Sequence, residues 1–169
     1  MRFSDDNPTL RLRKVHSGFT FVEMLVTLAI MAVLVTVAVP MTQVVAQRQK
    51  EQNLRSALIQ IREAIDAYKR ASDQGRIASK IGESGYPKVL DDLWLGVADQ
   101  RSPSQQKMYF LRSLPIDPFN PDGATKAADS WGLRSYASPP DDPSEGADVF
   151  DVYSKSEKTG LNGVAYKNW

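Results

Sequence analysis

The sequence has no cysteine and a single histidine, and both absences exclude kinds of chemistry. Without cysteine the chain can form neither disulfides nor thiolate sites. The one histidine, His16, lies within the first eighteen residues. The rest of the chain therefore cannot build a Ser-His-Asp triad or a usual zinc site. The G-x-S-x-G elbow and the phosphate-binding glycine loop are also missing, so we expect the protein not to be an enzyme.

An excess of charge of one sign is missing as well. The chain has 21 Lys and Arg against 20 Asp and Glu, for a net charge of +1. Residues 1–18 hold four of the basic and two of the acidic side chains, so the remainder is also close to neutral. Because binding to nucleic-acid phosphates needs a surplus of Lys and Arg, we do not expect nucleic acid as a partner.

One long apolar run is present, between Gly18 and Pro40, and Glu23 is its only charged residue. As a helix with a rise of about 1.5 Å per residue, it is long enough to cross the hydrocarbon core of a bilayer. A basic segment, residues 10–14, precedes it. The pattern predicts a transmembrane helix over residues 19–39. Since an ionisable group in a membrane span is costly, Glu23 is a candidate functional residue.

Two other interpretations of this run stay open. A secretory signal would be cut after the apolar run, at Val37-Ala38-Val39, but Pro40 is a poor neighbour for such a cut. A plain, uncleaved membrane anchor fits the length of the run, but it gives no reason for Glu23.

Beyond Pro40, over residues 40–74, the pattern becomes amphipathic. Apolar residues recur at helical spacing and predict one buried face: Leu54, Leu58, Ile61, Ile65 and Tyr68. We expect a single helix of about 50 residues that kinks at Pro40 and stops at Gly75, with an ion pair between Glu51 and Arg55. Its second half should pack on the chain's own globular part. The alternative, a coiled-coil arm, has too few heptads to support it.

Residues 75–169 are punctuated by proline and glycine and predict a small globular domain. We expect a short helix at 88–94 with Leu90, Leu93 and Trp94 buried, and a polar loop at 96–107. Alternating apolar and polar residues at 131–136 and 149–154 predict two strands. The fold class is therefore α+β: a long N-terminal helix, membrane-spanning in its first half and amphipathic in its second, packed on a small antiparallel sheet with long loops.

The junction Gly18-Phe19-Thr20-Phe21-Val22-Glu23 resembles the processing site of type IV pilin-like proteins. The resemblance implies that residues 1–18 are a leader, removed by a prepilin peptidase that cuts between Gly18 and Phe19. It also implies N-methylation of Phe19. Glu23 would then be the fifth residue of the mature chain, where the family carries its assembly glutamate, and Pro40 falls where many members have a kinking proline.

The segment from Met108 to Phe119 resembles one in the major pseudopilins of type II secretion, and the ending Asn168-Trp169 is also similar. Residues 120–130 look like an insertion relative to that family. The resemblance implies a homo-oligomeric filament subunit of a pseudopilus that drives protein export. Its partners would be minor pseudopilins, the peptidase and an inner-membrane assembly platform. It would be a single-pass protein of the bacterial inner membrane, with its C-terminal domain in the periplasm.

Two alternatives to this function stay open. The first is a type IV pilin or minor pilin. The absence of cysteine argues against it, because these proteins commonly carry a C-terminal disulfide loop. The other alternative is a bitopic inner-membrane protein whose outer domain binds a partner without polymerising.

Major pseudopilins typically bind calcium in the loop that corresponds to residues 155–167. Here that loop keeps one carboxylate, Glu157, among three lysines, Lys155, Lys158 and Lys167. A divalent cation needs several oxygen ligands and charge neutralisation. We therefore predict no metal and no cofactor, and expect a lysine ammonium to hold the loop through its carbonyl groups. The acidic group at 141–151 lacks ligand spacing, and we expect a solvated loop there.

Overall fold

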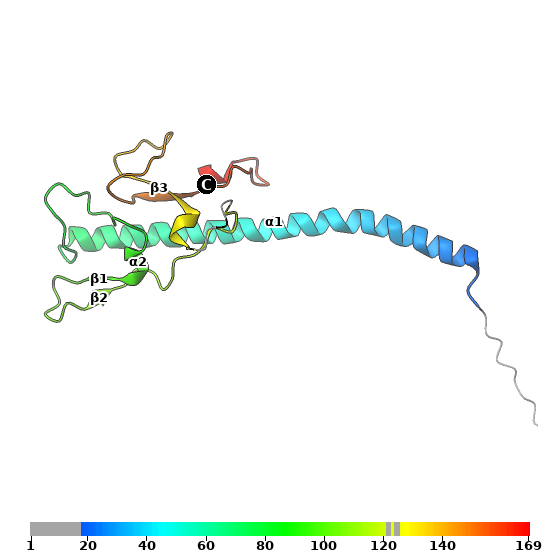
Figure 1. Ribbon diagram of the computed structural model, residues 1–169, viewed down its shortest axis with the longest axis horizontal. Coiled ribbons are helices and arrows are strands. Elements are labelled where there is room, and N and C mark those ends of the chain that lie inside the picture. Colours follow the sequence, from blue (N-terminus) through cyan, green and yellow to red (C-terminus); the bar gives the residue numbers. More distant parts are fainter. Residues whose placement is uncertain (1–17, 121–122, 124–125) are drawn as a thin grey trace, which may run out of the picture. The chain divides into compact units, whose positions relative to one another are not determined.

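The computed structural model describes residues 18–120, 123 and 126–169, and describes the side chains of all of these except 37–41. The predicted leader, residues 1–17, and part of the expected insertion at 120–130 lie outside the described residues. In chain order (Figure 1) the elements are α1 Phe21–Asp73, α2 Asp92–Leu95, β1 Val97–Ala98, β2 Lys107–Met108, η1 Ala128–Ser130, β3 Trp131–Arg134, β4 Asp151–Ser154 and η2 Tyr166–Asn168. The fold is α+β, a long N-terminal helix followed by small antiparallel sheets and loops, as predicted.

The chain divides into two compact units, Met1–Thr42 and Gln43–Trp169. Helix α1 contributes to both and is 53 residues long. It ends where the sequence predicts, because Gly75 adopts φ 69°, a left-handed conformation that favours glycine. The N–H of Gly75 donates to the carbonyl of Ser72 at 2.8 Å, and the N–H of Arg76 donates to that of Ala71 at 3.0 Å. The kink expected at Pro40 falls among residues 37–41 and stays a prediction.

The core of the second unit forms on one face of α1. The five apolar residues predicted to form this face are all at most 7 % exposed. They pack with residues from the rest of the same unit, mainly Leu90, Leu93, Trp131, Val149, Val152 and Tyr166. Burying each large side chain stabilises the unit by about 2 kcal/mol. The second half of α1 therefore packs on its own globular domain, and the coiled-coil alternative was wrong.

The segment after α1 differs from its prediction in two details. Helix α2 is one turn long and buries Leu93, but Trp94 is 39 % exposed, and its indole N–H donates to Asp91 Oδ1 at 2.9 Å. The expected loop at 96–107 contains a hairpin in which β1 pairs with β2 over two residues on each strand. Strands this short carry no readable alternation of polar and apolar residues.

Strands β3 and β4 form the second antiparallel sheet, which the sequence predicts with slightly longer strands. Trp131 pairs with Ser154 at one end, and Arg134 pairs with Asp151 at the other. Between them Gly132 faces Tyr153 so closely that an added Cβ would lie 2.3 Å from the tyrosine ring. The sheet and the β1–β2 hairpin appear on opposite sides of the second half of α1 in Figure 1.

Candidate processing and assembly site

The predicted processing residues lie directly before the first turn of α1. Gly18, Phe19 and Thr20 precede the helix, and Glu23 lies in its first turn. The backbone N–H of Glu23 donates to Thr20 Oγ1 at 3.3 Å, so Thr20 caps the helix. The spacing Thr20-x-x-Glu23 is that of a capping box, a signal the sequence analysis missed. The carboxylate of Glu23 has no hydrogen bond or ion pair to any described residue.

Gly18 is not required by the local structure. A Cβ added to it would meet no atom within 4 Å among the described residues, and its φ lies outside the left-handed region. A larger residue would therefore fit there sterically. Among the described residues, nothing requires a glycine at this position.

The first part of α1 exposes its apolar side chains all around. Every residue from 18 to 36 is exposed, including Leu25, Leu28, Ile30 and Leu34, which are 51–63 % exposed. Apolar patches of more than a few hundred Å² are rare on soluble monomers and mark interaction surfaces. In the part of the chain that the structure describes, no helix has a stretch both long and apolar enough to cross a bilayer. The predicted span 19–39 includes residues 37–39, whose side chains lie outside the described part.

In the second unit, the loop of residues 155–167 is held by a carboxylate that the sequence analysis assigned elsewhere. Glu51, on α1, is 8 % exposed. Its Oε1 accepts hydrogen bonds from the backbone N–H of Leu161 at 2.8 Å, the hydroxyl of Tyr166 at 3.0 Å and the amide of Gln47 at 3.2 Å. The expected ion pair with Arg55 is absent from the described contacts, because the Arg55 guanidinium lies over the Trp169 ring, 4.4 Å from its centroid.

The expectation that a lysine holds this loop was wrong. Lys155 Nζ donates to the carbonyl of Asp129, outside the loop, at 2.9 Å, and the loop is bonded to α1 instead by the N–H of Leu161, which donates to the Glu51 carboxylate. Among the described residues, no group of three or more His, Cys, Asp or Glu could hold a metal ion.

The surroundings of Glu51 perturb its titration. Burial raises the pKa of the Glu51 carboxyl. The hydrogen bonds from Leu161, Tyr166 and Gln47, together with the charge of Arg55, lower this pKa by more than burial raises it, so the net shift is downward. A carboxyl whose pKa is lowered by folding stabilises the fold above its unfolded pKa, about 4.3. That contribution is lost as the pH falls through the folded value.

Replacing Glu51 by alanine should reduce the free energy of unfolding by about 2–3 kcal/mol, because buried donors lose their acceptor. Glu51→Gln keeps an acceptor oxygen and should cost about 1 kcal/mol. The stability difference between wild type and Glu51→Gln should be constant above about pH 5 and vanish in acid, as urea unfolding at several pH values would show. Calcium should leave the melting temperature of the wild type unchanged. A difference that persists in acid, or a large calcium shift, would contradict this account.

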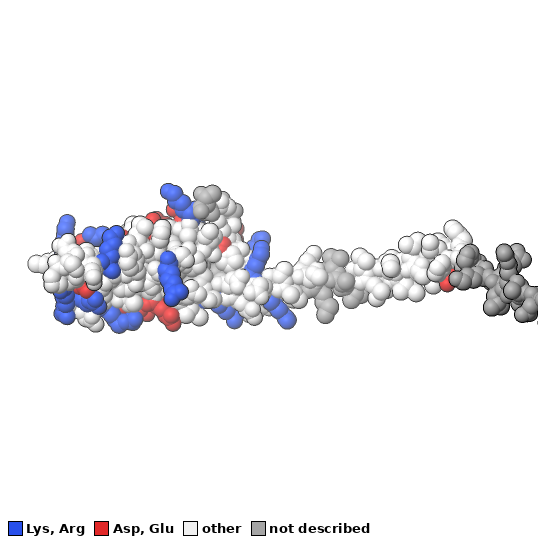
Figure 2. Space-filling model, turned by 90° about the horizontal axis from the view of Figure 1, so that it is seen from below, with Lys and Arg blue, Asp and Glu red and all other residues white. Residues whose placement is uncertain are grey.

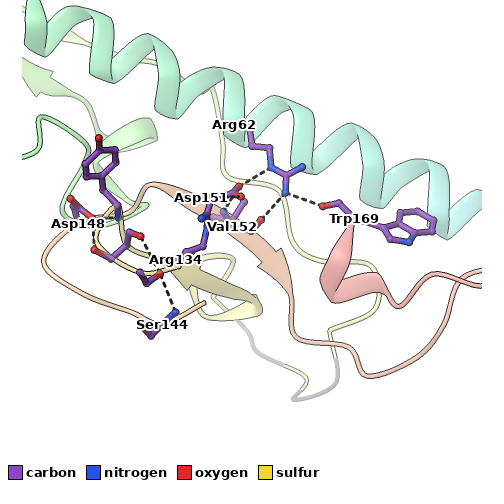
Figure 3. A network of polar contacts seen from close by, with 10 residues as sticks. Arg62, Arg134, Ser144, Asp148, Asp151, Val152 and Trp169 are labelled. Carbon is purple, nitrogen blue, oxygen red and sulfur yellow. Dashed lines mark hydrogen bonds and ion pairs between the residues drawn. The ribbon is translucent and has the colours of Figure 1, made fainter. Parts of the chain in front are cut away.

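A polar network joins α1 to β4 and to the last residue of the chain (Figure 3). Arg62 Nε pairs with Asp151 Oδ1 at 2.8 Å, and its Nη2 donates to the carbonyl oxygens of Val152 at 3.3 Å and Trp169 at 2.9 Å. Arg134 lies on the other side of Asp151, with an N–O distance of 3.5 Å. One guanidinium thus fixes the sheet and the C-terminal segment to the helix.

Comparison with known proteins agrees with the N-terminal geometry. The family described as the prokaryotic N-terminal methylation motif matches residues 13–39. The type II secretion system core protein G of Klebsiella michiganensis is 25% identical over 114 residues, which cover 65% of this chain and 72% of that protein. No solved structure gives a significant match.

The matched motif covers the junction at Gly18 and Phe19, the capped start of α1 and its exposed apolar part, and it indicates a membrane-anchored protein. The similarity to core protein G extends over most of the chain. Both comparisons support the resemblance predicted from the junction residues: the chain is similar to type IV pilin-like proteins and, among these, to a pseudopilin of type II secretion.

Proposed function

We propose that the protein is a structural subunit of a pseudopilus, which assembles from the bacterial inner membrane and drives export by a type II secretion-like system. The observation that carries the proposal is the methylation motif at residues 13–39. It overlaps the start of α1, where every residue from Phe21 to Thr36, the apolar ones included, is exposed. Both similarities point to a structural secretion component rather than to an enzyme. The partners are further copies of the chain, minor pseudopilins, a prepilin peptidase and an inner-membrane assembly platform.

The first step is processing at the junction. The peptidase cuts between Gly18 and Phe19 and leaves Phe19 as an N-methylated terminus. Gly18 suits this role because the fold does not need it, so the peptidase's own preference for a small residue can explain its presence. The processed chain stays in the inner membrane by its apolar helix, with the C-terminal domain in the periplasm.

The second step is assembly, in which Glu23 sets the register. The ammonium group of Phe19 in one subunit pairs with the carboxylate of Glu23 in a neighbour, inside a bundle of apolar helices. Glu23 suits this role because its carboxylate has no partner within the described chain. A buried charge left unpaired costs several kcal/mol, so misplaced docking is disfavoured. Apolar residues such as Leu25 and Leu28, exposed in the single chain, supply most of the adhesion.

Mass spectrometry of the protein purified from cells that possess the peptidase tests the first step. The expected product starts at Phe19 and carries one added methyl group. Cells that lack the peptidase provide the control and should yield the unprocessed chain, with Met1 as its first residue. An unprocessed chain in both cells would refute the proposal and favour a bitopic protein that does not polymerise.

A further inference from the structure

Three cationic side chains near the start of the second unit have no partner among the described residues. Arg48 and Lys50 lie on α1, Lys158 lies in the loop of residues 155–167, and all three are exposed. None of these side chains forms a hydrogen bond or an ion pair with any described residue. The nearest acidic residue along this part of α1, Glu51, is buried and already accepts three hydrogen bonds. On the face that Figure 2 shows, Lys and Arg side chains project where α1 enters the globular unit.

Two of these cations share a hollow in the surface of the second unit. Its volume is about 560 Å³, and it is lined by Gln43, Ala46, Gln47, Lys50, Phe119, Lys158, Thr159 and Tyr166. The lining contains two ammonium groups, the Gln43 amide and the Thr159 hydroxyl, but no carboxylate; its Gln47 amide and Tyr166 hydroxyl already donate to Glu51. Such a set of donors suits an anion with several oxygen atoms, such as a phosphodiester.

The position of these residues along the chain indicates where that anion comes from. Gln43 is the first residue of the second unit, and Lys50 follows seven residues later, about 10 Å along a helix. The apolar run proposed to anchor the chain, residues 19–39, ends three residues before Thr42, the residue next to Gln43. Cations on the outer side of a membrane span run against the usual topological bias, so topology does not explain them. Close to an anionic membrane surface, each Lys or Arg strengthens binding about fivefold.

We propose that Arg48, Lys50 and Lys158 form a cationic collar that binds the phosphate groups of anionic phospholipids. The collar holds the globular unit against the membrane surface while the subunit waits to be assembled. This inference rests on the proposed function, because it needs the apolar part of α1 to sit in the bilayer.

The test uses the full-length chain in vesicles, labelled at one site. Because the sequence has no cysteine, Leu161→Cys supplies a single thiol for a fluorophore, close to Lys158 on the exposed side of the loop. Quenching by a quencher fixed to lipid headgroups reports how close the loop lies to the surface. Vesicles of phosphatidylcholine alone are compared with a mixture of phosphatidylglycerol and phosphatidylcholine, each over a series of salt concentrations.

In anionic vesicles at low salt we expect strong quenching that weakens as salt is added. The double variant Lys50→Gln, Lys158→Gln should lower the ratio of docked to undocked protein about 25-fold, at about fivefold per charge. The matched control is Lys80→Gln, Arg101→Gln, which removes the same charge from two exposed residues near the C-terminal end of α1. Arg101 lies near that end because the neighbouring Gln100 N–H donates to the carbonyl of Arg76, which follows α1. This control should dock as the wild type does.

The outcomes separate the collar from the proposed function. Flotation of the vesicles in a density gradient shows whether the chain is bound to them. A chain that is bound but is quenched equally in neutral and anionic lipid would overturn the collar alone. Quenching that follows the protein-to-lipid ratio rather than the lipid charge would identify a second copy of the chain as the partner and would also overturn it. A chain that does not float with either vesicle would overturn the membrane anchor and, with it, the collar.

Discussion

Replacing Glu23 by alanine is expected to abolish incorporation into filaments while leaving membrane insertion and cleavage intact. The variant removes the carboxylate that is proposed to pair with the terminal ammonium group of a neighbour. An ammonium left buried without that partner costs several kcal/mol, so incorporation should fall by at least about tenfold. Sedimentation of sheared filaments, with the membrane fraction and the mature mass measured in parallel, would quantify the loss.

The structure makes this substitution interpretable, because the cap at Thr20 uses the backbone N–H of residue 23 and not its side chain. The start of α1 should therefore survive the change. Glu23→Gln keeps the size of the side chain, and it should fail almost as completely if charge is what matters. Glu63→Ala removes an exposed glutamate from the same helix and should assemble normally. Normal assembly of Glu23→Ala would remove the proposed role in register.

The largest loss of stability is expected from Asp117→Ala, in the turn before the second sheet. Asp117 is 2 % exposed, and its carboxylate accepts the N–H of Phe119 at 2.7 Å and the hydroxyl of Ser154 at 2.6 Å. Its own N–H donates to Ser130 Oγ at 3.1 Å, which ties the turn to the residues before β3. The buried Ser154 hydroxyl and the partly buried Phe119 N–H would lose their acceptor, at a cost of about 3 kcal/mol or more. Urea unfolding of residues 43–169 would measure it.

The control for Asp117 is an aspartate that makes no described contact. Asp142 is exposed, and Asp142→Ala should change the free energy of unfolding by less than about 0.5 kcal/mol. Asp117→Asn should fall between the two, because its amide keeps one acceptor oxygen but presents N–H groups toward Ser154. Equal stability of the Asp117→Ala and Asp142→Ala variants would show that the turn does not depend on this carboxylate.

The long helix and its buried face could be predicted because both follow from the spacing of apolar residues that are close together in the sequence. The recurrence of Leu54, Leu58 and Ile61 at helical intervals identifies the face that the structure buries, and Gly75 marks the stop. The strands β3 and β4 could be predicted from the alternation of apolar and polar residues in the sequence, although only β4 alternates in burial, since β3 buries Trp131 and Gly132 side by side. The two-residue strands β1 and β2 are too short for any period to appear.

The contacts that hold the C-terminal loop could not be predicted, because they join residues far apart in the chain. Glu51 lies three residues before Leu54, so the same spacing places a carboxylate beside the buried face. That signal was available, but its partner Leu161 is 110 residues away. Arg62 likewise meets Asp151 across 89 residues. Helical spacing can therefore identify a buried carboxylate, but the group that donates a hydrogen bond to it can be identified only from the folded structure.

The capped start of α1 has a consequence for the proposed cleavage between Gly18 and Phe19. The peptide bond between Gly18 and Phe19 precedes the first helical residue, Phe21, and lies outside the ladder of helix hydrogen bonds that starts with the Met24 N–H donating to the Thr20 carbonyl at 3.2 Å. A peptidase can therefore bind and cleave this peptide bond in an extended conformation without unwinding any turn of α1. If the proposed cleavage occurs, the mature chain starts at Phe19, only two residues before the first helical residue, Phe21, so helix α1 needs no further folding at its start.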